Sequence, residues 1–226
     1  MSVKIFLLFG RSGCGKGTQG KLLAKKFGLT VYGSGNLLRA RAQKDDFSGK
    51  KLKKVLAKGV LAPTSLIYKE WANKFDALKK DKNFKGMILD GSPRKEIEAD
   101  LLNQAFEWYE WKNVYRILID ISRKEAQGRL LKRRICRKCD RIFPWIGEFK
   151  KLEKCDQCGG ELERRGDDEV SAIKERLDYY EKEVVPMIEY YEKRSELITV
   201  SGEQEIEKVF ENILSESTNK NPNQRI

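Results

Sequence analysis

A glycine-rich stretch near the start of the chain has the residue types of a phosphate-binding loop. Residues 10–18 read GRSGCGKGT, between an apolar run at 3–9 and a helix-like run at 19–27. A strand, a glycine-rich turn and a helix N-terminus aim backbone N–H groups and a positive dipole end at one anion. Lys16 can reach a terminal phosphate, and the Thr18 hydroxyl can reach phosphate or metal. The hydroxyl stands one position later than in the general motif, but the flanking elements disfavour an ordinary glycine-rich turn.

Four of the five cysteines form two Cys-x2-Cys pairs separated by fifteen residues: Cys136, Cys139, Cys155 and Cys158. This spacing is typical of a tetrahedral zinc site, and four protein thiolates leave no open position, which indicates a structural metal. The alternatives are four buried reduced cysteines and a nucleic-acid-binding ribbon. The fifth cysteine, Cys14, is interpreted as a small filler in the phosphate loop, with a redox role as the alternative. The chain has no histidine, which excludes imidazole-based catalysis.

The bulk composition indicates one globular domain with insertions. The chain has 226 residues, of which 40% are hydrophobic, and a net charge of +12. A basic surface attracts nucleotides or nucleic acid, although most of the lysines read as solvated helix faces. No run is long enough to cross a membrane and no cleavable signal begins the chain, so we expect a cytoplasmic protein.

Strand-like and helix-like segments alternate along the chain. Buried strands are predicted at 3–9, 29–32, 86–90, 114–121 and 197–200, and helices at 16–27, 36–44, 63–79, 97–111, 123–134, 167–194 and 205–214, with Pro186 as a kink. This order predicts an α/β fold with a doubly wound, five-stranded parallel sheet of the P-loop NTPase type.

Two segments interrupt the alternation. Residues 33–62 and 135–166 leave from the carboxyl edge of the predicted sheet, so both can close over the phosphate loop. We therefore expect a core domain of 1–32, 63–134 and 167–214, a binding segment at 33–62, a metal-binding lid at 135–166, and a disordered tail at 215–226. Ser34 is expected to cap a helix whose start, with Arg39 nearby, forms a second anion site.

Five motifs occur in order: GRSGCGKGTQ, GSGNLLR, DGSPR, RLLKRR and RRGDDEVSAIKERL, with the paired cysteine segment between the last two. With these motifs, residues 3–214 resemble the adenylate kinases of the long type with a zinc-binding lid. The resemblance implies reversible phosphoryl transfer from ATP with Mg²⁺ to AMP, giving two ADP, with structural Zn²⁺ in the lid. It also implies a monomer, and we expect neither a nucleic-acid nor a membrane partner.

The same resemblance implies the site residues. The catalytic cations would be Lys16, Arg39, Arg94, Arg133, Arg165 and Arg176. ATP would bind Gly13, Cys14, Gly15, Lys16, Gly17, Thr18, Arg129, Arg133 and Gln204. The monophosphate would bind Ser34, Gly35, Arg39, Ala62, Gly91, Arg94, Glu98, Arg165 and Arg176, and Asp90 would hold Mg²⁺ through water. Asp167 and Asp168 would engage lid arginines or the nucleotide. Surface ion pairs are expected for Arg123, Arg134, Arg137, Arg141 and Arg164.

The chain departs from the family pattern in the acceptor half. Glu98 stands where the family has Gln, and an ionised Glu only accepts hydrogen bonds, so it cannot read both N1 and N6 of adenine. Ser34, Asn36 and Ser92 stand where the family has Thr, Asp and Phe, and Ser12 where it has Pro. Three functions therefore stay open: an adenylate kinase, a kinase of GMP or another monophosphate, and a non-catalytic zinc protein that binds nucleotide or nucleic acid.

Overall fold

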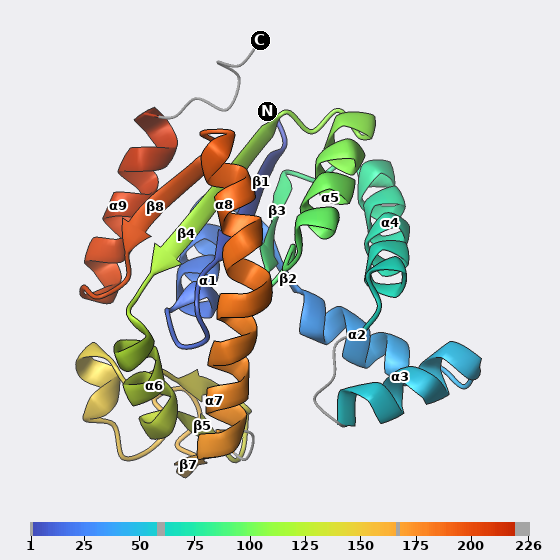
Figure 1. Cartoon of the computed structure of the whole chain (residues 1–226). Coiled ribbons are helices and arrows are strands. Elements are labelled where there is room, and N and C mark those ends of the chain that lie inside the picture. Colours follow the sequence, from blue (N-terminus) through green and yellow to red (C-terminus); the bar gives the residue numbers. More distant parts are fainter. Residues whose placement is uncertain (1, 58–61, 166–167, 220–226) are drawn as a thin grey trace.

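Five parallel strands form the central sheet of the computed structural model, which describes residues 2–57, 62–165 and 168–219 (Figure 1). They are β1 (Lys4–Phe9), β2 (Thr30–Gly33), β3 (Gly86–Asp90), β4 (Asn113–Asp120) and β8 (Leu197–Ser201). Their spatial order is β2-β3-β1-β4-β8. The predicted doubly wound parallel sheet is confirmed, and β1, which leads into the phosphate loop, lies at its centre.

Side chains of β1 alternate between two hydrophobic clusters because successive residues of a strand point to opposite faces. Ile5, Leu7 and Phe9 belong to the first cluster, and Phe6 and Leu8 to the second. Each of these five residues is at most 2% exposed. A strand buried on both faces needs an apolar residue at every position, which explains the uninterrupted apolar run in the sequence.

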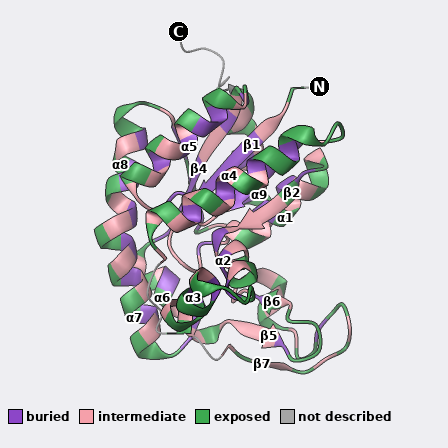
Figure 2. Cartoon of the chain, turned by 90° about the vertical axis from the view of Figure 1, so that its right-hand side faces the viewer, coloured by how far each residue is buried: buried purple, intermediate pink, exposed green. Residues whose placement is uncertain are grey.

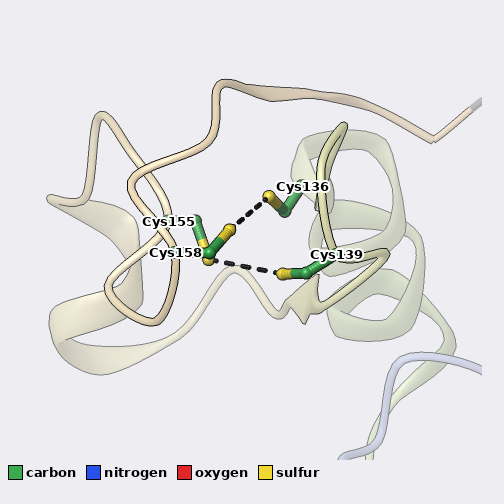
Figure 3. Close-up of side chains that lie close together, drawn as sticks. All are labelled: Cys136, Cys139, Cys155 and Cys158. Atoms are coloured by element: carbon green, nitrogen blue, oxygen red, sulfur yellow. Dashed lines mark hydrogen bonds between the residues drawn. The ribbon is translucent and has the colours of Figure 1, made fainter.

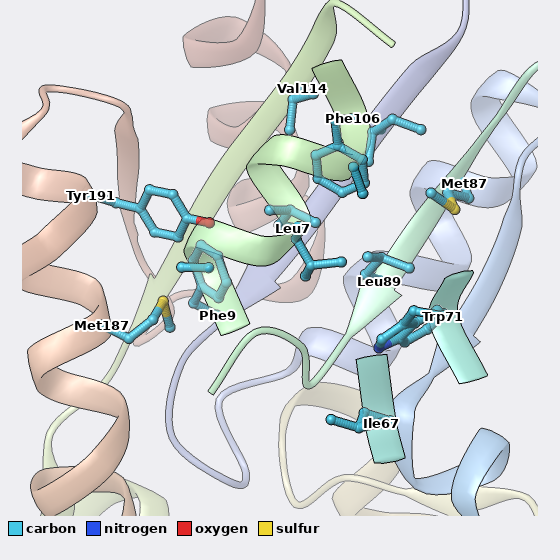
Figure 4. Packing of buried hydrophobic residues seen from close by; sticks show 14 of the residues in the cluster. Leu7, Phe9, Ile67, Trp71, Met87, Leu89, Phe106, Val114, Met187 and Tyr191 are labelled. Atoms are coloured by element: carbon cyan, nitrogen blue, oxygen red, sulfur yellow. The ribbon is translucent and has the colours of Figure 1, made fainter. Parts of the chain in front are cut away.

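Helices cover both faces of the sheet. The first cluster contains residues of α4 (Thr64–Lys80), α5 (Glu96–Trp108) and α8 (Val185–Lys193), seen in Figure 4 as Trp71, Phe106 and Tyr191 around Leu7 and Leu89. The second contains residues of α1 (Lys16–Phe27), α6 (Arg123–Lys132), α7 (Val170–Tyr179) and α9 (Ile206–Asn219). The buried residues follow the sheet and the inner helix surfaces in Figure 2. In the described part of the chain, no helix is both long and apolar enough to span a bilayer.

The two insertions lie at the end of the sheet toward which the strands run (Figure 1). Helices α2 (Ser34–Ala42) and α3 (Phe47–Ala57) form the first insertion. The second holds a small antiparallel sheet in the order β6-β5-β7, made of β5 (Arg134–Cys136), β6 (Ile142–Phe143) and β7 (Leu162–Arg164), with the 3-10 turn η1 (Gly147–Lys150).

One segment differs from expectation, and a second has a feature that the sequence did not specify. Helix α9 continues to Asn219, so the first five residues of the segment expected to be disordered are helical, whereas 220–226 lie outside the described residues. Leu214, the predicted last residue of the helix, packs against the second cluster, and its carbonyl oxygen accepts from the Thr218 hydroxyl at 2.9 Å. The kink expected at Pro186 stays a prediction, and the structure adds a π-helical segment, η2 (Tyr180–Val184), just before the proline. Because proline has no backbone N–H, the regular hydrogen-bond ladder is interrupted there.

Candidate active site

The phosphate loop depends on three glycines with positive φ. Gly10, Gly13 and Gly15 have φ of 136°, 88° and 105°, a region that side-chain-bearing residues rarely adopt. A Cβ on Gly10 would also overlap the carbonyl oxygen of Ile119. The ammonium group of Lys16 donates to the carbonyl oxygens of Gly10 at 2.6 Å and Arg11 at 3.1 Å. The expected phosphate-binding lysine is therefore held over the loop, at the N-terminus of α1.

The carboxylate of Asp90 lies beside the start of α1. A Cβ added to Gly17 would lie 3.9 Å from Oδ2 of Asp90, so the end of β3 faces the phosphate loop. Carboxylates combined with water are the ligands that Mg²⁺ prefers, and the Thr18 hydroxyl is on the same first turn. The donor set fits a magnesium ion bound between Asp90 and nucleotide phosphates.

Two residues expected to bind the monophosphate, Ser34 and Arg94, meet at Gly91, the residue that follows Asp90. The hydroxyl of Ser34 donates to the carbonyl oxygen of Gly91 at 2.8 Å, and Nε of Arg94 donates to the same oxygen at 2.9 Å. Ser34 therefore does not cap α2, as the sequence had suggested, because the N-cap is Gly33 and the hydroxyl is used elsewhere. This contact joins the first insertion to the end of β3.

Glu98 and Arg39 occupy the flanks of this group. The carboxylate of Glu98 accepts a hydrogen bond from the backbone N–H of Arg94 at 2.8 Å. Arg39 is exposed and its guanidinium donates to Oδ1 of Asn36. A Cβ on Gly35 would lie 3.2 Å from that guanidinium, so Gly35 allows Arg39 to lie over the first turn of α2.

Asp168 pairs with two of the expected catalytic arginines at the exit of the lid. Arg133 donates twice, from Nε and Nη2, at 2.7 Å each, and Arg176 donates once at 2.6 Å. Burial by itself would raise the pKa of Asp168, but the hydrogen bonds and positive charges of the two arginines hold that pKa below its usual value. Asp168 thus stays ionised and keeps both guanidiniums at one point. Asp167, the other acidic residue expected here, lies outside the described residues.

The remaining expected residues lie at the rims of this region. Arg129 is buried and donates to Glu125 at 2.6 Å and to the carbonyl oxygen of Gly202 at 2.9 Å. The side chain of Gln204 contacts Ser201 and Asn212. Arg165 is half-buried after β7, and Ala62 packs against the first cluster before α4. The nucleotide contacts expected of these four residues, like those of the other site residues, stay predictions.

The four lid cysteines converge (Figure 3). Their sulfur atoms all lie within 4.8 Å of one another, with Cys136–Cys158 at 3.5 Å and Cys139–Cys155 at 3.6 Å. A zinc ion about 2.3 Å from each of four tetrahedral thiolates requires sulfur–sulfur separations of about 3.8 Å. A Cβ on Gly160 would lie 2.7 Å from the Cys136 sulfur. The donor set and its spacing fit zinc, with glycine required beside it.

Several polar contacts could not be read from the sequence. Arg134 was expected in a surface ion pair, which is wrong: its guanidinium donates to the carbonyl oxygens of Leu152 and Phe149 within the lid. Ser92 accepts a hydrogen bond from the indole of Trp71 at 3.2 Å. Arg11, inside the phosphate loop, is not among the site residues expected from the sequence, although a charged residue within a glycine-rich turn is itself a signal.

Three of the other expected ion pairs are confirmed, and the pair expected of Arg164 stays a prediction. Arg123 pairs with Asp178, Arg137 with Glu163, and Arg141 with Asp156. Cys14 is 3% exposed, in agreement with a small residue that fills the loop.

Comparisons with known proteins agree with this geometry. A sequence profile described as "Adenylate kinase" matches residues 8–196. An adenylate kinase of Methanocella arvoryzae is 38% identical over 205 residues, covering 90% of this chain and 94% of its own. One from Chlamydia trachomatis is 35% identical, covering 92% of this chain and 87% of its own. One from Petrotoga mobilis is 34% identical, covering 92% and 95%.

Proposed function

The chain belongs to the adenylate kinase family, and we propose that it transfers the terminal phosphoryl group of ATP reversibly to AMP. The observation that supports this most directly is the end of β3. Asp90 faces the phosphate loop, whereas the next residue, Gly91, accepts hydrogen bonds from Ser34 and Arg94. The residues expected to bind the phosphoryl donor and those expected to bind the acceptor therefore meet at two consecutive residues of the chain.

The arrangement suits phosphoryl transfer, which requires positioning and charge neutralisation more than covalent chemistry. Lys16 would hold the terminal phosphates of the donor. Arg39 and Arg94 would hold the acceptor phosphate in line with the donor, and Arg133 and Arg176 would neutralise the charge that develops between them. When bound beside Asp90, Mg²⁺ would supply further neutralisation.

The lid would exclude water during transfer. Its four cysteines would bind zinc, which fixes a small insertion that cannot build a large core of its own. Among the described residues of the lid, the buried ones are Cys136, Phe143 and Cys155. Asp168 binds both Arg133 and Arg176 where the lid joins the core. A movement of the lid at this junction would therefore bring positive charge closer to the phosphates.

AMP is the acceptor that we propose. The carboxylate of Glu98 is hydrogen-bonded to the Arg94 N–H through one oxygen, so the other is left to accept from an exocyclic amino group such as N6 of adenine. GMP, CMP and UMP serve as the competing acceptors in the test.

The experiment measures ADP formation from ATP with each of the four monophosphates, on protein whose zinc content is determined on the same sample. We expect kcat/KM to be highest for AMP, and Lys16→Ala to remove turnover. Lys21→Ala is the matched control, because Lys21 is an exposed lysine one turn further along α1. A higher kcat/KM with another monophosphate would refute the acceptor assignment, and no turnover in zinc-loaded protein would refute the kinase.

A further inference from the structure

Arg11 projects from the phosphate loop to two other parts of the chain. Its guanidinium donates to Oδ1 of Asp120 at 3.0 Å and to the carbonyl oxygen of Ile121 at 2.8 Å, both at the end of β4. It also donates from Nε and Nη2 to Oε1 of Glu181, at 3.2 and 3.0 Å. Arg11 thus links the phosphate loop both to the end of β4 and to the long helix that follows the lid.

On the helix side, Arg11 also packs against a buried aromatic ring. The guanidinium lies 4.8 Å from the centre of the Tyr180 ring, a distance that suits cation–π attraction. Tyr180 is 5% exposed and belongs to the first hydrophobic cluster. Arg11 therefore rests on a residue that the core holds in place.

The sequence explains why the helix is irregular at this point. Pro186 lacks a backbone N–H, and the N–H of Val185 bonds to the carbonyl oxygen of Tyr180, five residues earlier. Such π-helical turns often occur at functional sites. Tyr180 and Glu181 are the first two residues of this wide turn, and both contact Arg11.

Four of the five N–H groups of the Arg11 guanidinium are used within the protein, which argues against a direct role as a phosphate ligand. It makes four hydrogen bonds, and its side chain is 17% exposed. Its main chain, in contrast, shapes the loop: the Arg11 carbonyl oxygen accepts from the N–H of Cys14 and from the ammonium group of Lys16, at 3.1 Å each. Any movement of Arg11 would therefore be passed to the lysine expected to hold the donor phosphates.

We propose that Arg11 is a positioning residue for ATP, which fixes the phosphate loop relative to the helix that carries Arg176. The proposal rests on the proposed kinase function only in naming ATP as the nucleotide. Arg176 lies in α7, whose last residue, Tyr179, is followed directly by η2. Arg11 thus sets the spacing between the loop that grips the donor and an arginine expected to act on the transferred group.

The test compares Arg11→Ala with Arg123→Ala. The control removes an arginine that pairs with Asp178 on the same helix, three residues before Glu181, but that has no contact with the phosphate loop among the described residues. ATP affinity is measured calorimetrically, and KM is measured for ATP and for AMP. We expect Arg11→Ala to weaken ATP binding about tenfold and to change the KM for AMP less than about twofold. Arg123→Ala should change neither.

Two further variants separate positioning from general destabilisation. Arg11→Lys keeps the charge but loses the planar fork, so its ATP affinity should fall between those of the wild type and Arg11→Ala. Glu181→Gln should weaken ATP binding on its own and have little additional effect in the Arg11→Ala background. Unchanged ATP affinity in Arg11→Ala would overturn the proposal, as would an equal loss for ATP and AMP accompanied by a lower melting temperature. A wild type that binds ATP but forms no ADP would refute the kinase function instead.

Discussion

Replacing Asp168 with asparagine should destabilise the junction between the lid and the core. Asn has nearly the same shape as Asp but no charge, so the change removes the attraction to Arg133 and Arg176 and leaves two cations facing each other. Of the two polar atoms of the Asn side chain, only the amide oxygen can still accept a hydrogen bond from a guanidinium. The substitution therefore tests the pairing without opening a cavity.

The expected magnitude follows from burial. Breaking a buried ion pair by removing one partner costs about 3–5 kcal/mol. The side chain of Asp168 is 2% exposed, but those of Arg133 and Arg176 are 14% and 31% exposed, so water can partly solvate the cations left behind. We therefore expect a loss of about 3 kcal/mol in the free energy of unfolding, at the low end of that range.

Urea denaturation at a series of pH values gives the assay. Because the pKa of Asp168 is lowered in the folded protein, its contribution to stability is present above the pKa of the unfolded carboxyl, about 3.9. That contribution is lost as the pH falls through the lower pKa of the folded state. The difference between wild type and Asp168→Asn should thus be constant near neutrality and shrink below about pH 4.

Asp178→Asn supplies the matched control. Asp178 pairs with a single arginine, and their side chains are 53% and 40% exposed, so its loss should cost less than about 1 kcal/mol. Equal losses in the two variants would refute the reasoning, because burial would then have no influence. A difference for Asp168→Asn that does not change between neutral and acid pH would show that the carboxylate charge is not responsible.

Three further outcomes are expected. Glu98→Gln keeps an oxygen for the Arg94 N–H and adds an amide donor, so the KM for AMP should fall about fivefold while the KM for ATP does not change. An unchanged KM for AMP would contradict this expectation. Gly160→Ala places a Cβ 2.7 Å from the Cys136 sulfur, so the amount of bound zinc and the melting temperature should both fall. The control Gly128→Ala, with open space around its Cβ, should lower neither, and full zinc content in Gly160→Ala would contradict the geometry. Tyr179→Phe removes a buried hydroxyl that has no hydrogen-bond partner among the described residues, and should raise the free energy of unfolding by about 1 kcal/mol in urea denaturation; a loss would show that the hydroxyl has a partner in solution.

The sheet and the phosphate loop could be predicted because each depends on local sequence. A run of apolar residues such as 3–9 forms a buried strand wherever the sheet lies, and glycines at fixed spacing form the loop that follows. The convergence of the four cysteines could likewise be predicted from their spacing alone. The π-helical segment was signalled only indirectly, by a proline inside a helix.

The roles of individual arginines could not be predicted in the same way. Arg134 and Arg129 both end on backbone carbonyl oxygens: Arg134 on Leu152 and Phe149, Arg129 on Gly202. A carbonyl group is present at every residue, so no residue type in the sequence marks such a partner. Ion pairs such as Arg123–Asp178 were easier to anticipate, because they require only an exposed cation with acidic residues within reach.

The position of Asp90 and Gly91 shows how core packing controls the site. Trp71 in α4 is 2% exposed, and its indole donates to the hydroxyl of Ser92, two residues beyond Asp90. The side of α4 that packs on the sheet therefore also fixes the turn between the expected donor and acceptor halves. Because Gly91 lies within this turn and accepts from both Ser34 and Arg94, displacement of Trp71 would move the acceptor half relative to the phosphate loop. Transfer depends on that separation, since the reacting atoms must be held in line and close to contact. We therefore expect Trp71, a buried core residue, to take part in setting the geometry of the reaction.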